Sequence, residues 1–149
     1  MKVTVSTPSI SVAAIRLSKS SHLPVLKDGP WKRICDYLLV YAFDGIEYAI
    51  FVELKKTLSD NNGPKEQLRR SLPFLEYLRS VCDIEYGNET AHSNMRIRYF
   101  RIGEKLSPRF DKQFVKVGPD RILKREEYEN IAINTLVGPR VSLATLSRA

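Results

Sequence analysis

Two apolar runs joined by Asp44-Gly45 constrain the fold of this chain more than any other feature. Residues 35–43 and residues 46–54 are both rich in β-branched and aromatic side chains. An Asp-Gly pair between two such runs is the strongest short-range sequence signal for a β-hairpin with a two-residue turn. Because both faces of each run are apolar, we expect the hairpin to be covered on two sides, as central strands of a sheet are.

The two-residue turn also sets the register of the predicted hairpin. With Phe43 facing Ile46, Asp36 lies directly opposite Glu53, and opposed residues have Cβ atoms roughly 4.5–5.5 Å apart. Side chains alternate along a strand, so Lys55 points to the same face as Glu53. Two carboxylates and one ammonium group are therefore expected to converge at one end of the hairpin. A slip of one residue would undo this arrangement.

Two carboxylates side by side in an apolar hairpin are unfavourable for stability. Like charges placed opposite each other destabilise a sheet, and burial would force one carboxyl group to take up a proton. Mg²⁺ or Mn²⁺ removes the problem, because hard cations prefer carboxylate and carbonyl oxygens. We therefore expect Asp36 and Glu53 to ligate the metal, together with the carbonyl oxygen of Leu54. Lys55 would orient an attacking water or stabilise charge on a phosphate; the alternative is an ordinary ion pair with Glu53 or Asp36.

The composition is that of a basic globular protein. The 149 residues include 24 Lys and Arg against 17 Asp and Glu, which gives a net charge of +7. The length suits a single domain over residues 1–149, and the charge favours polyanionic partners such as nucleic acid. The two cysteines form no zinc-binding or disulfide pattern. No signal peptide and no membrane-spanning run is visible, so we expect a cytoplasmic protein with no membrane partner.

Weaker patterns surround the hairpin. Residues 1–30 indicate one or two short strands, with a short helix near 11–18 as the alternative. A helix is expected from Pro64 to about residue 81, with Pro73 kinking it or splitting it in two. The remaining expectations are a polar loop at 56–63, a polar connection at 83–94, a strand at 95–102, a small hairpin from 114–117 and 121–123, a helix at 126–136, and a flexible tail at 138–149.

The acidic and basic residues follow one another in a recognisable order. A strand begins with Cys35-Asp36, the next strand ends in Glu53-Leu54-Lys55, and the following helix carries Gln67. This order resembles the PD-(D/E)xK, or restriction endonuclease-like, nuclease superfamily over about residues 33–80.

The resemblance implies both a fold and a set of catalytic roles. The fold would be an α/β restriction endonuclease-like core, with a mixed central β-sheet flanked by helices. The activity would be Mg²⁺-dependent cleavage of phosphodiester bonds, in which Asp36 and Glu53 ligate metal and Lys55 assists the nucleophile or the transition state. Gln67 matches a helix glutamine that many members carry, and here it would orient Lys55 or the phosphate. Cys35 stands where the family pattern has proline.

These observations lead to two functional hypotheses. The first is a metal-dependent nuclease, acting on DNA in preference to RNA, alone or with a second copy or partner subunit. The second is a catalytically weak or inactive module of the same fold that binds nucleic acid or a protein partner. The basic residues expected to contact nucleic acid are Lys56, Arg69, Arg70, Arg96 and Arg98, with Arg101 close by.

Overall fold

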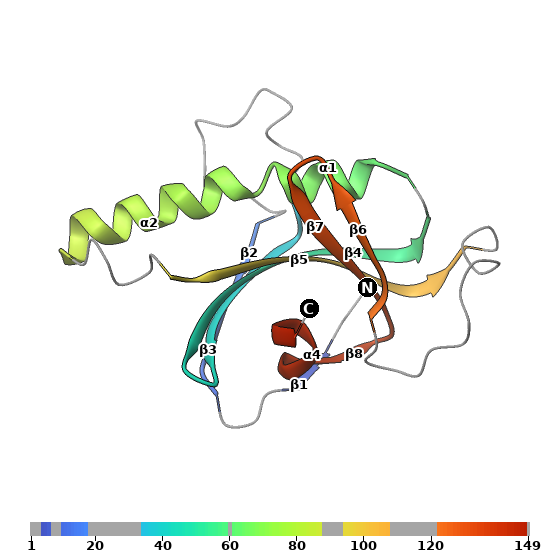
Figure 1. Ribbon diagram of the computed structural model, residues 1–149, viewed down its shortest axis with the longest axis horizontal. Helices are drawn as coiled ribbons and strands as arrows, with labels where there is room; N and C mark the ends of the chain where they lie inside the picture. The colour runs from blue at the N-terminus through green and yellow to red at the C-terminus, as the bar shows by residue number, and fades with distance from the viewer. Residues whose placement is uncertain are drawn as a thin grey trace.

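A mixed six-stranded sheet forms the centre of the protein (Figure 1). The computed structural model describes residues 4–6, 10–17, 34–59, 61–87, 94–107 and 122–148. Within these residues the sheet has the order β2-β3-β4-β5-β7-β6. The strand β5 is parallel to both of its neighbours, and the other pairs are antiparallel. The bounds are β2 Val12–Arg16, β3 Tyr37–Phe43, β4 Ile46–Leu58, β5 Arg96–Leu106, β6 Ile122–Tyr128 and β7 Ile131–Val137.

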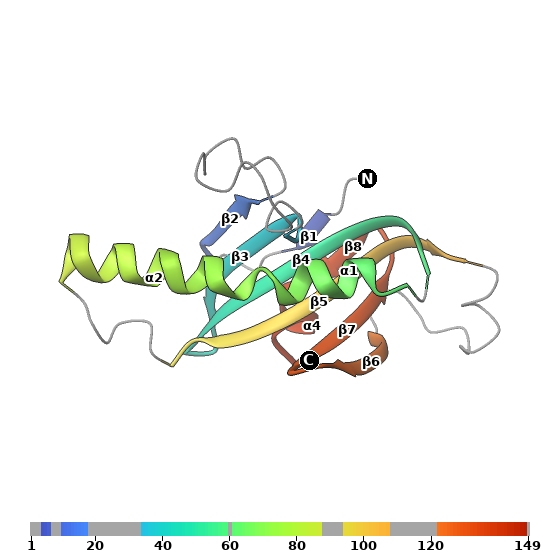
Figure 2. The same ribbon diagram turned by 90° about the horizontal axis from the view of Figure 1, so that it is seen from above.

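Each face of the sheet is covered by a separate layer (Figure 2). The helices α1 (Gly63–Arg69) and α2 (Leu72–Tyr86) lie on one face. The helix α4 (Leu143–Arg148) lies on the other, with a small parallel pair formed by β1 (Thr4–Ser6) and β8 (Arg140–Ser142). The protein is therefore an α/β fold with a mixed sheet flanked by helices, as the sequence predicted.

Two hydrophobic cores result from these layers. The first core lies under α1 and α2, and its buried members include Leu38, Phe51, Leu68 and Leu75. The second core lies under α4, and its buried members include Leu39, Ile50, Leu143 and Leu146. Neighbouring residues of β3 and β4 thus alternate between the two cores, which is why both runs of the hairpin are apolar on both faces.

The β3–β4 hairpin has the predicted register. Phe43 pairs with Ile46 and Leu38 pairs with Phe51. The turn residues Asp44 and Gly45 have φ of 51° and 74°. Positive φ at both turn positions is the type I′ geometry that an Asp-Gly pair favours. The strand β4 continues to Leu58, so the loop expected at 56–63 is shorter than predicted.

Proline divides the helical segment into two helices, as expected. Pro64 lies in the first turn of α1 and Pro73 in the first turn of α2, where a proline ring and its missing N–H do no harm. The second helix ends at Gly87, which has the left-handed φ of 66° common at a helix C-terminus. Residues 83–86, expected to be a connection, are therefore helical.

Two other expectations were wrong. Residues 126–136 are not a helix but the two strands β6 and β7, joined at Glu129, whose φ is 53°. The segment 138–149 is not a loose tail, because β8 and α4 bury side chains in the second core. The short strands expected in residues 1–30 are confirmed at Thr4–Ser6 and Val12–Arg16. The rest of the segment 18–33 and the strand expected at 114–117 lie outside the described residues.

Gly103 in β5 is covered so closely by Leu58 that a side chain would not fit. A Cβ atom added to Gly103 would lie 2.6 Å from Leu58 Cδ1. We expect Gly103→Ala to lower the free energy of unfolding by about 1–3 kcal/mol, because Leu58 must move in a packed region. Urea unfolding should show a smaller cost of Gly103→Ala in a Leu58→Ala background. Equal costs in both backgrounds would contradict this contact as the cause.

Candidate functional site

The structure brings Asp36, Glu53 and Lys55 to the same place. Glu53 and Lys55 lie in β4 and alternate in step with Phe51, so they point to the face covered by α1 and α2. Asp36 directly precedes β3, and its Oδ2 accepts a hydrogen bond from the backbone N–H of Leu54 at 2.8 Å. This bond holds the Asp36 carboxylate against the strand that carries Glu53.

Glu53 is a buried carboxylate that is only partly neutralised. It is 1% exposed. Its Oε1 forms an ion pair with Lys55 Nζ at 2.5 Å, whereas its Oε2 is buried without a hydrogen-bond partner among the described residues. Burial raises the pKa of Glu53 to about 7, and the charge of Asp36 adds to this against the lowering effect of Lys55. Asp36 and Glu53, here called the acid pair, are therefore not fully neutralised by Lys55.

The Oε2 atom of Glu53 is the observation that tests whether a divalent cation would fit between Asp36 and Glu53. An ordinary ion pair accounts for Oε1 but leaves Oε2 unsatisfied, and a buried unsatisfied carboxylate oxygen is costly. A hard cation between Asp36 and Glu53 would satisfy it with oxygen ligands of the preferred kind. The described residues contain no group of three or more His, Cys, Asp or Glu side chains placed to hold a metal. Asp36 and Glu53 would therefore be the two side-chain ligands of such a cation. Backbone carbonyl oxygen or water would have to complete its coordination shell.

A second polar cluster continues the same row across the sheet. Arg101 of β5 is the register partner of Glu53 and is fully buried. Its guanidinium donates to Glu126 Oε1 at 2.8 Å and to Thr135 Oγ1 at 3.1 Å. Glu126 also pairs with Lys65 of α1 at 3.2 Å. Arg101, which lies close to the basic residues named from the sequence, is thus held inside the protein.

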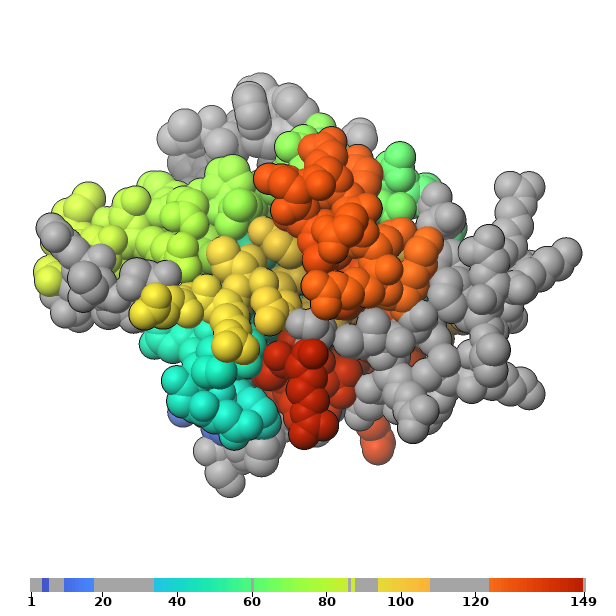
Figure 3. All heavy atoms as spheres, viewed as in Figure 1, coloured from blue at the N-terminus to red at the C-terminus, as the bar shows by residue number. Residues whose placement is uncertain are grey.

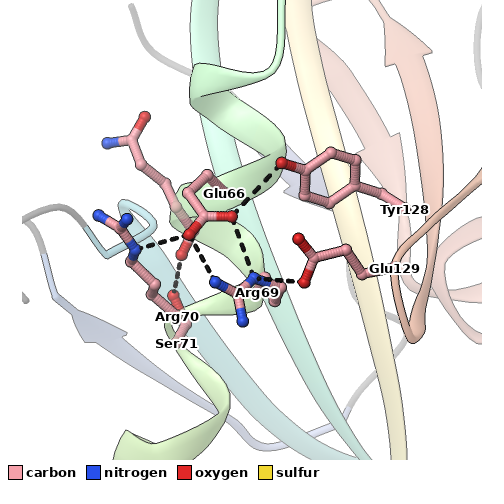
Figure 4. Close-up of polar contacts among 7 residues, drawn as sticks. Glu66, Arg69, Arg70, Ser71, Tyr128 and Glu129 are labelled. Carbon is pink, nitrogen blue, oxygen red and sulfur yellow. Dashed lines mark hydrogen bonds and ion pairs between the residues drawn. The ribbon is translucent and has the colours of Figure 1, made fainter.

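The first turn of α1 carries a third cluster, centred on Glu66 (Figure 4). Arg69 donates to both carboxylate oxygens of Glu66, at 2.6 and 3.0 Å, and Arg70 Nε donates at 2.8 Å. Tyr128 of β6 donates its hydroxyl at 3.4 Å, and Arg69 also pairs with Glu129 at 3.1 Å. The hydrogen bonds from Arg69 lower the pKa of Glu66 to about 2.

The clusters around Glu66 and Glu126 attach the β6–β7 hairpin to α1. Figure 3 shows this hairpin in orange standing against the green helical segment. Their carboxylates are therefore occupied in holding the fold together rather than being presented to a ligand.

No protein-family model, curated protein or solved structure matches this chain. A function must therefore be supported by the geometry of the residues themselves. No helix in the described part of the chain is long and apolar enough to span a membrane.

Gln67 and Arg70 lie together at a cavity beside α1. The cavity has a volume of about 380 Å³ and is lined by Gly63, Glu66, Gln67 and Arg70. Leu68 of the same helix packs in the first core. Helix α1 lies on the same side of the sheet as Glu53 and Lys55, but no described contact joins Gln67 or Arg70 to these residues.

The other basic residues named from the sequence lie elsewhere. Arg96 and Arg98 pair in register with Tyr48 and Ile50, whose side chains belong to the second core, so they alternate onto the face under α4. Lys56 is exposed but alternates away from Lys55. The structure does not bring these three side chains to the acid pair. The face on which Arg96 and Arg98 lie depends on the pairing of β5 with β4, and no local feature of the sequence predicts that pairing.

The thiol of Cys35 is unsuited to catalysis or to metal binding. Cys35 is fully buried, and burial raises the pKa of its thiol to about 12. A thiol with so high a pKa stays protonated and is a poor nucleophile and a poor metal ligand. Cys35 is a small buried residue of the first core.

Proposed function

We propose that this protein is a metal-dependent nuclease that hydrolyses phosphodiester bonds, with DNA as the favoured substrate. We further propose that β3, β4, α1, α2 and β5 make up a restriction endonuclease-like core. The observation that carries the proposal is the buried Oε2 of Glu53, which has no hydrogen-bond partner among the described residues and lies close to a second carboxylate, Asp36. The net charge of +7 favours a polyanionic substrate.

The acid pair is the proposed site for Mg²⁺ or Mn²⁺. Asp36 and Glu53 would hold the cation, with the carbonyl oxygen of Leu54 as a further ligand. A cation bound there supplies Lewis acidity for the scissile phosphate and lowers the pKa of a bound water. The hydrogen bond from Leu54 N–H fixes the Asp36 carboxylate in place before any cation arrives.

Lys55 and Gln67 complete the proposed site with donors. Lys55 is 35% exposed at its side chain, so its ammonium group lies at the boundary between the buried Glu53 and solvent. From there it stabilises negative charge that develops on a phosphate. Gln67 lies in α1 and lines the cavity with Arg70, where its amide can hold a phosphate oxygen or the lysine.

Arg70, rather than Arg69, is the proposed phosphate contact on α1. Arg69 pairs with both Glu66 and Glu129 and does not line the cavity, whereas Arg70 pairs with Glu66 and does line it. We expect Arg70→Ala to reduce the slope of log K against log salt for DNA binding by about 1, the effect of one lost phosphate contact. Arg69→Ala should leave that slope unchanged. Fluorescence anisotropy with a labelled duplex in EDTA measures both, and equal slopes for the two variants would contradict the assignment.

The second candidate is a module that binds nucleic acid or a protein without cleaving it. It is favoured by the small number of metal-ligating side chains in the described residues and by the direct ion pair between Lys55 and Glu53. In this case the ion pair is structural and no cation is needed. Salt-dependent DNA binding would then persist without any metal requirement.

Two measurements on the unmodified protein separate the candidates. Supercoiled plasmid should be nicked or linearised in the presence of Mg²⁺ or Mn²⁺ and should stay intact in EDTA. Isothermal titration calorimetry with MnCl₂ should show heat of binding. Plasmid that stays intact with both metals, together with no heat at millimolar Mn²⁺, would reject the nuclease in favour of the binding module.

A further inference from the structure

Ser71 has a hydroxyl group in an unusual position. It precedes α2 as its N-cap residue, and serine is a preferred capping residue, yet its side chain makes no capping hydrogen bond. Ser71 is fully buried. Its Oγ instead donates to the carbonyl oxygen of Gln67 at 2.8 Å and accepts from the backbone N–H of Cys35 at 2.9 Å. A residue suited to capping one helix is therefore used to join two other segments.

The two segments that Ser71 joins both belong to the proposed site. Cys35 directly precedes Asp36, whose carboxylate in turn accepts the N–H of Leu54. Gln67 lies one helical turn before Ser71 and lines the cavity. A continuous chain of hydrogen bonds therefore runs from α1 through Ser71 and the Cys35-Asp36 segment to β4.

We propose that Ser71 is a positioning residue, whose hydroxyl fixes the Asp36 carboxylate relative to β4 and relative to the helix that carries Gln67. The catalytic part of this inference rests on the proposed nuclease function. Ser71 touches neither the cation site nor a substrate, so it acts only through Asp36 and Gln67. The backbone N–H of Cys35 is necessary for the link, and a proline at position 35 would lack it.

A purely structural role for Ser71 predicts a different result. A hydroxyl that does no more than satisfy a buried N–H would, when removed, affect stability and the exchange of the Cys35 amide alone. A positioning residue must also loosen the bond between Leu54 N–H and Asp36, because that bond depends on where Asp36 is held. The amide of Leu54 is thus the diagnostic group.

Ser80 offers a matched control within α2. Its Oγ donates to the carbonyl oxygen of Glu76 at 3.0 Å, which is the same bond to the preceding turn that Ser71 makes to Gln67. Ser80 is exposed and lies in α2, which extends away from α1 in Figure 1. Ser80→Ala therefore removes an equivalent intrahelical bond without touching the link to Asp36.

The first experiment measures amide hydrogen exchange by NMR in the metal-free protein. Ser71→Ala should speed the exchange of both the Cys35 and Leu54 amides by about tenfold or more, the factor that 1.4 kcal/mol of lost local stability gives. Ser80→Ala should leave both unchanged, and Ser71→Thr, which keeps the hydroxyl, should restore protection of Leu54. Wild-type exchange at Leu54 in Ser71→Ala would overturn the proposal. This experiment needs no enzyme activity, so it decides the positioning role even if the protein cleaves nothing.

The second experiment measures cleavage, with all variants held at a temperature where circular dichroism shows them folded. Ser71→Ala should lower kcat by about 10- to 100-fold with little change in KM, since misplacement of a catalytic group by about 1 Å can cost as much. Adding Gln67→Ala to Ser71→Ala should cost less than Gln67→Ala alone in wild type. A kcat equal to that of Ser80→Ala would overturn the catalytic part, whereas a wild-type protein that fails to cleave would reject the nuclease function itself.

Discussion

Glu53→Gln is expected to lower the rate of Mg²⁺-dependent plasmid cleavage by about 100-fold or more. Changing groups that merely support a metal ligand commonly costs about 10- to 100-fold, and Glu53 would be the ligand itself. The substitution keeps the size of the side chain and removes the negative charge. Because Glu53 is buried beside Asp36, no other described carboxylate is placed to replace it.

Lys55→Ala should reduce the same rate by about 10²–10³-fold, the usual effect of removing a donor that stabilises charge in a transition state. Initial rates of nicking at saturating Mg²⁺ measure both effects. Matched controls are Glu104→Gln, on an exposed part of β5, and Arg140→Ala, exposed on β8; each makes the same kind of charge change away from the acid pair. Wild-type rates in both site variants would reject the catalytic assignment.

Glu53→Gln should also change how stability depends on pH in the metal-free protein. The pKa of Glu53 is raised from 4.5 to about 7 in the folded state, mainly by burial. Between these pH values the folded protein binds a proton that the unfolded chain has lost, so stability falls as pH rises through this window. The effect is absent below pH ~4.5, where both states are protonated, and is complete above pH ~7. The raised pKa corresponds to roughly 3 kcal/mol of lost stability at alkaline pH.

Urea unfolding in EDTA at a series of pH values measures this effect. The free energy of unfolding of wild type should fall relative to that of Glu53→Gln as pH rises from ~4.5 to ~7. Above pH ~7 the difference between the two proteins should stay constant. Glu66, whose pKa is lowered to about 2 by Arg69, has the opposite dependence at acid pH but is common to both proteins. Mn²⁺ should restore the stability of wild type at pH 8 and have little effect on the variant. If the free energy of unfolding in EDTA depends on pH in the same way for both proteins, the raised pKa of Glu53 is contradicted.

Local signals were sufficient to predict the hairpin and the divided helix. Asp44-Gly45 permits one tight turn, and that turn alone determines which residues of β3 and β4 face each other. Pro73 cannot continue a helix begun at Pro64 without losing a hydrogen bond. In each case a few neighbouring residues determine the outcome, so no knowledge of distant contacts was needed.

The errors arose where distant contacts decide the structure. The stripe in residues 126–136 suits an amphipathic helix, but the same apolar residues also suit a strand buried on both faces, which β7 is. The last residues form α4 because the second core needs Leu143 and Leu146 to cover it. Neither requirement is visible before the sheet is assembled.

The residues of the candidate site also differ in whether local signals or distant contacts determine their positions. The hairpin register predicts that Asp36, Glu53 and Lys55 lie close together, although the ladder ends at Tyr37 and Val52 and a hydrogen bond from Leu54 N–H holds Asp36. The register does not predict the positions of Ser71 and Glu126, because Ser71 contacts Cys35 and Glu126 contacts Arg101 from remote parts of the chain. Position in the chain gave no reason to single out either residue.

The sheet separates the layer that holds the proposed site from the layer formed by α4, β1 and β8. Asp36, Glu53 and Lys55 lie on the side of the sheet that α1 and α2 cover, whereas α4 covers the opposite side with Leu143 and Leu146. Substitutions in the second core could therefore be used to raise the melting temperature while the first core and the proposed site stay unchanged. The same separation offers a protected place for a fluorescent or spin label, whose signal would report on unfolding without interfering with DNA.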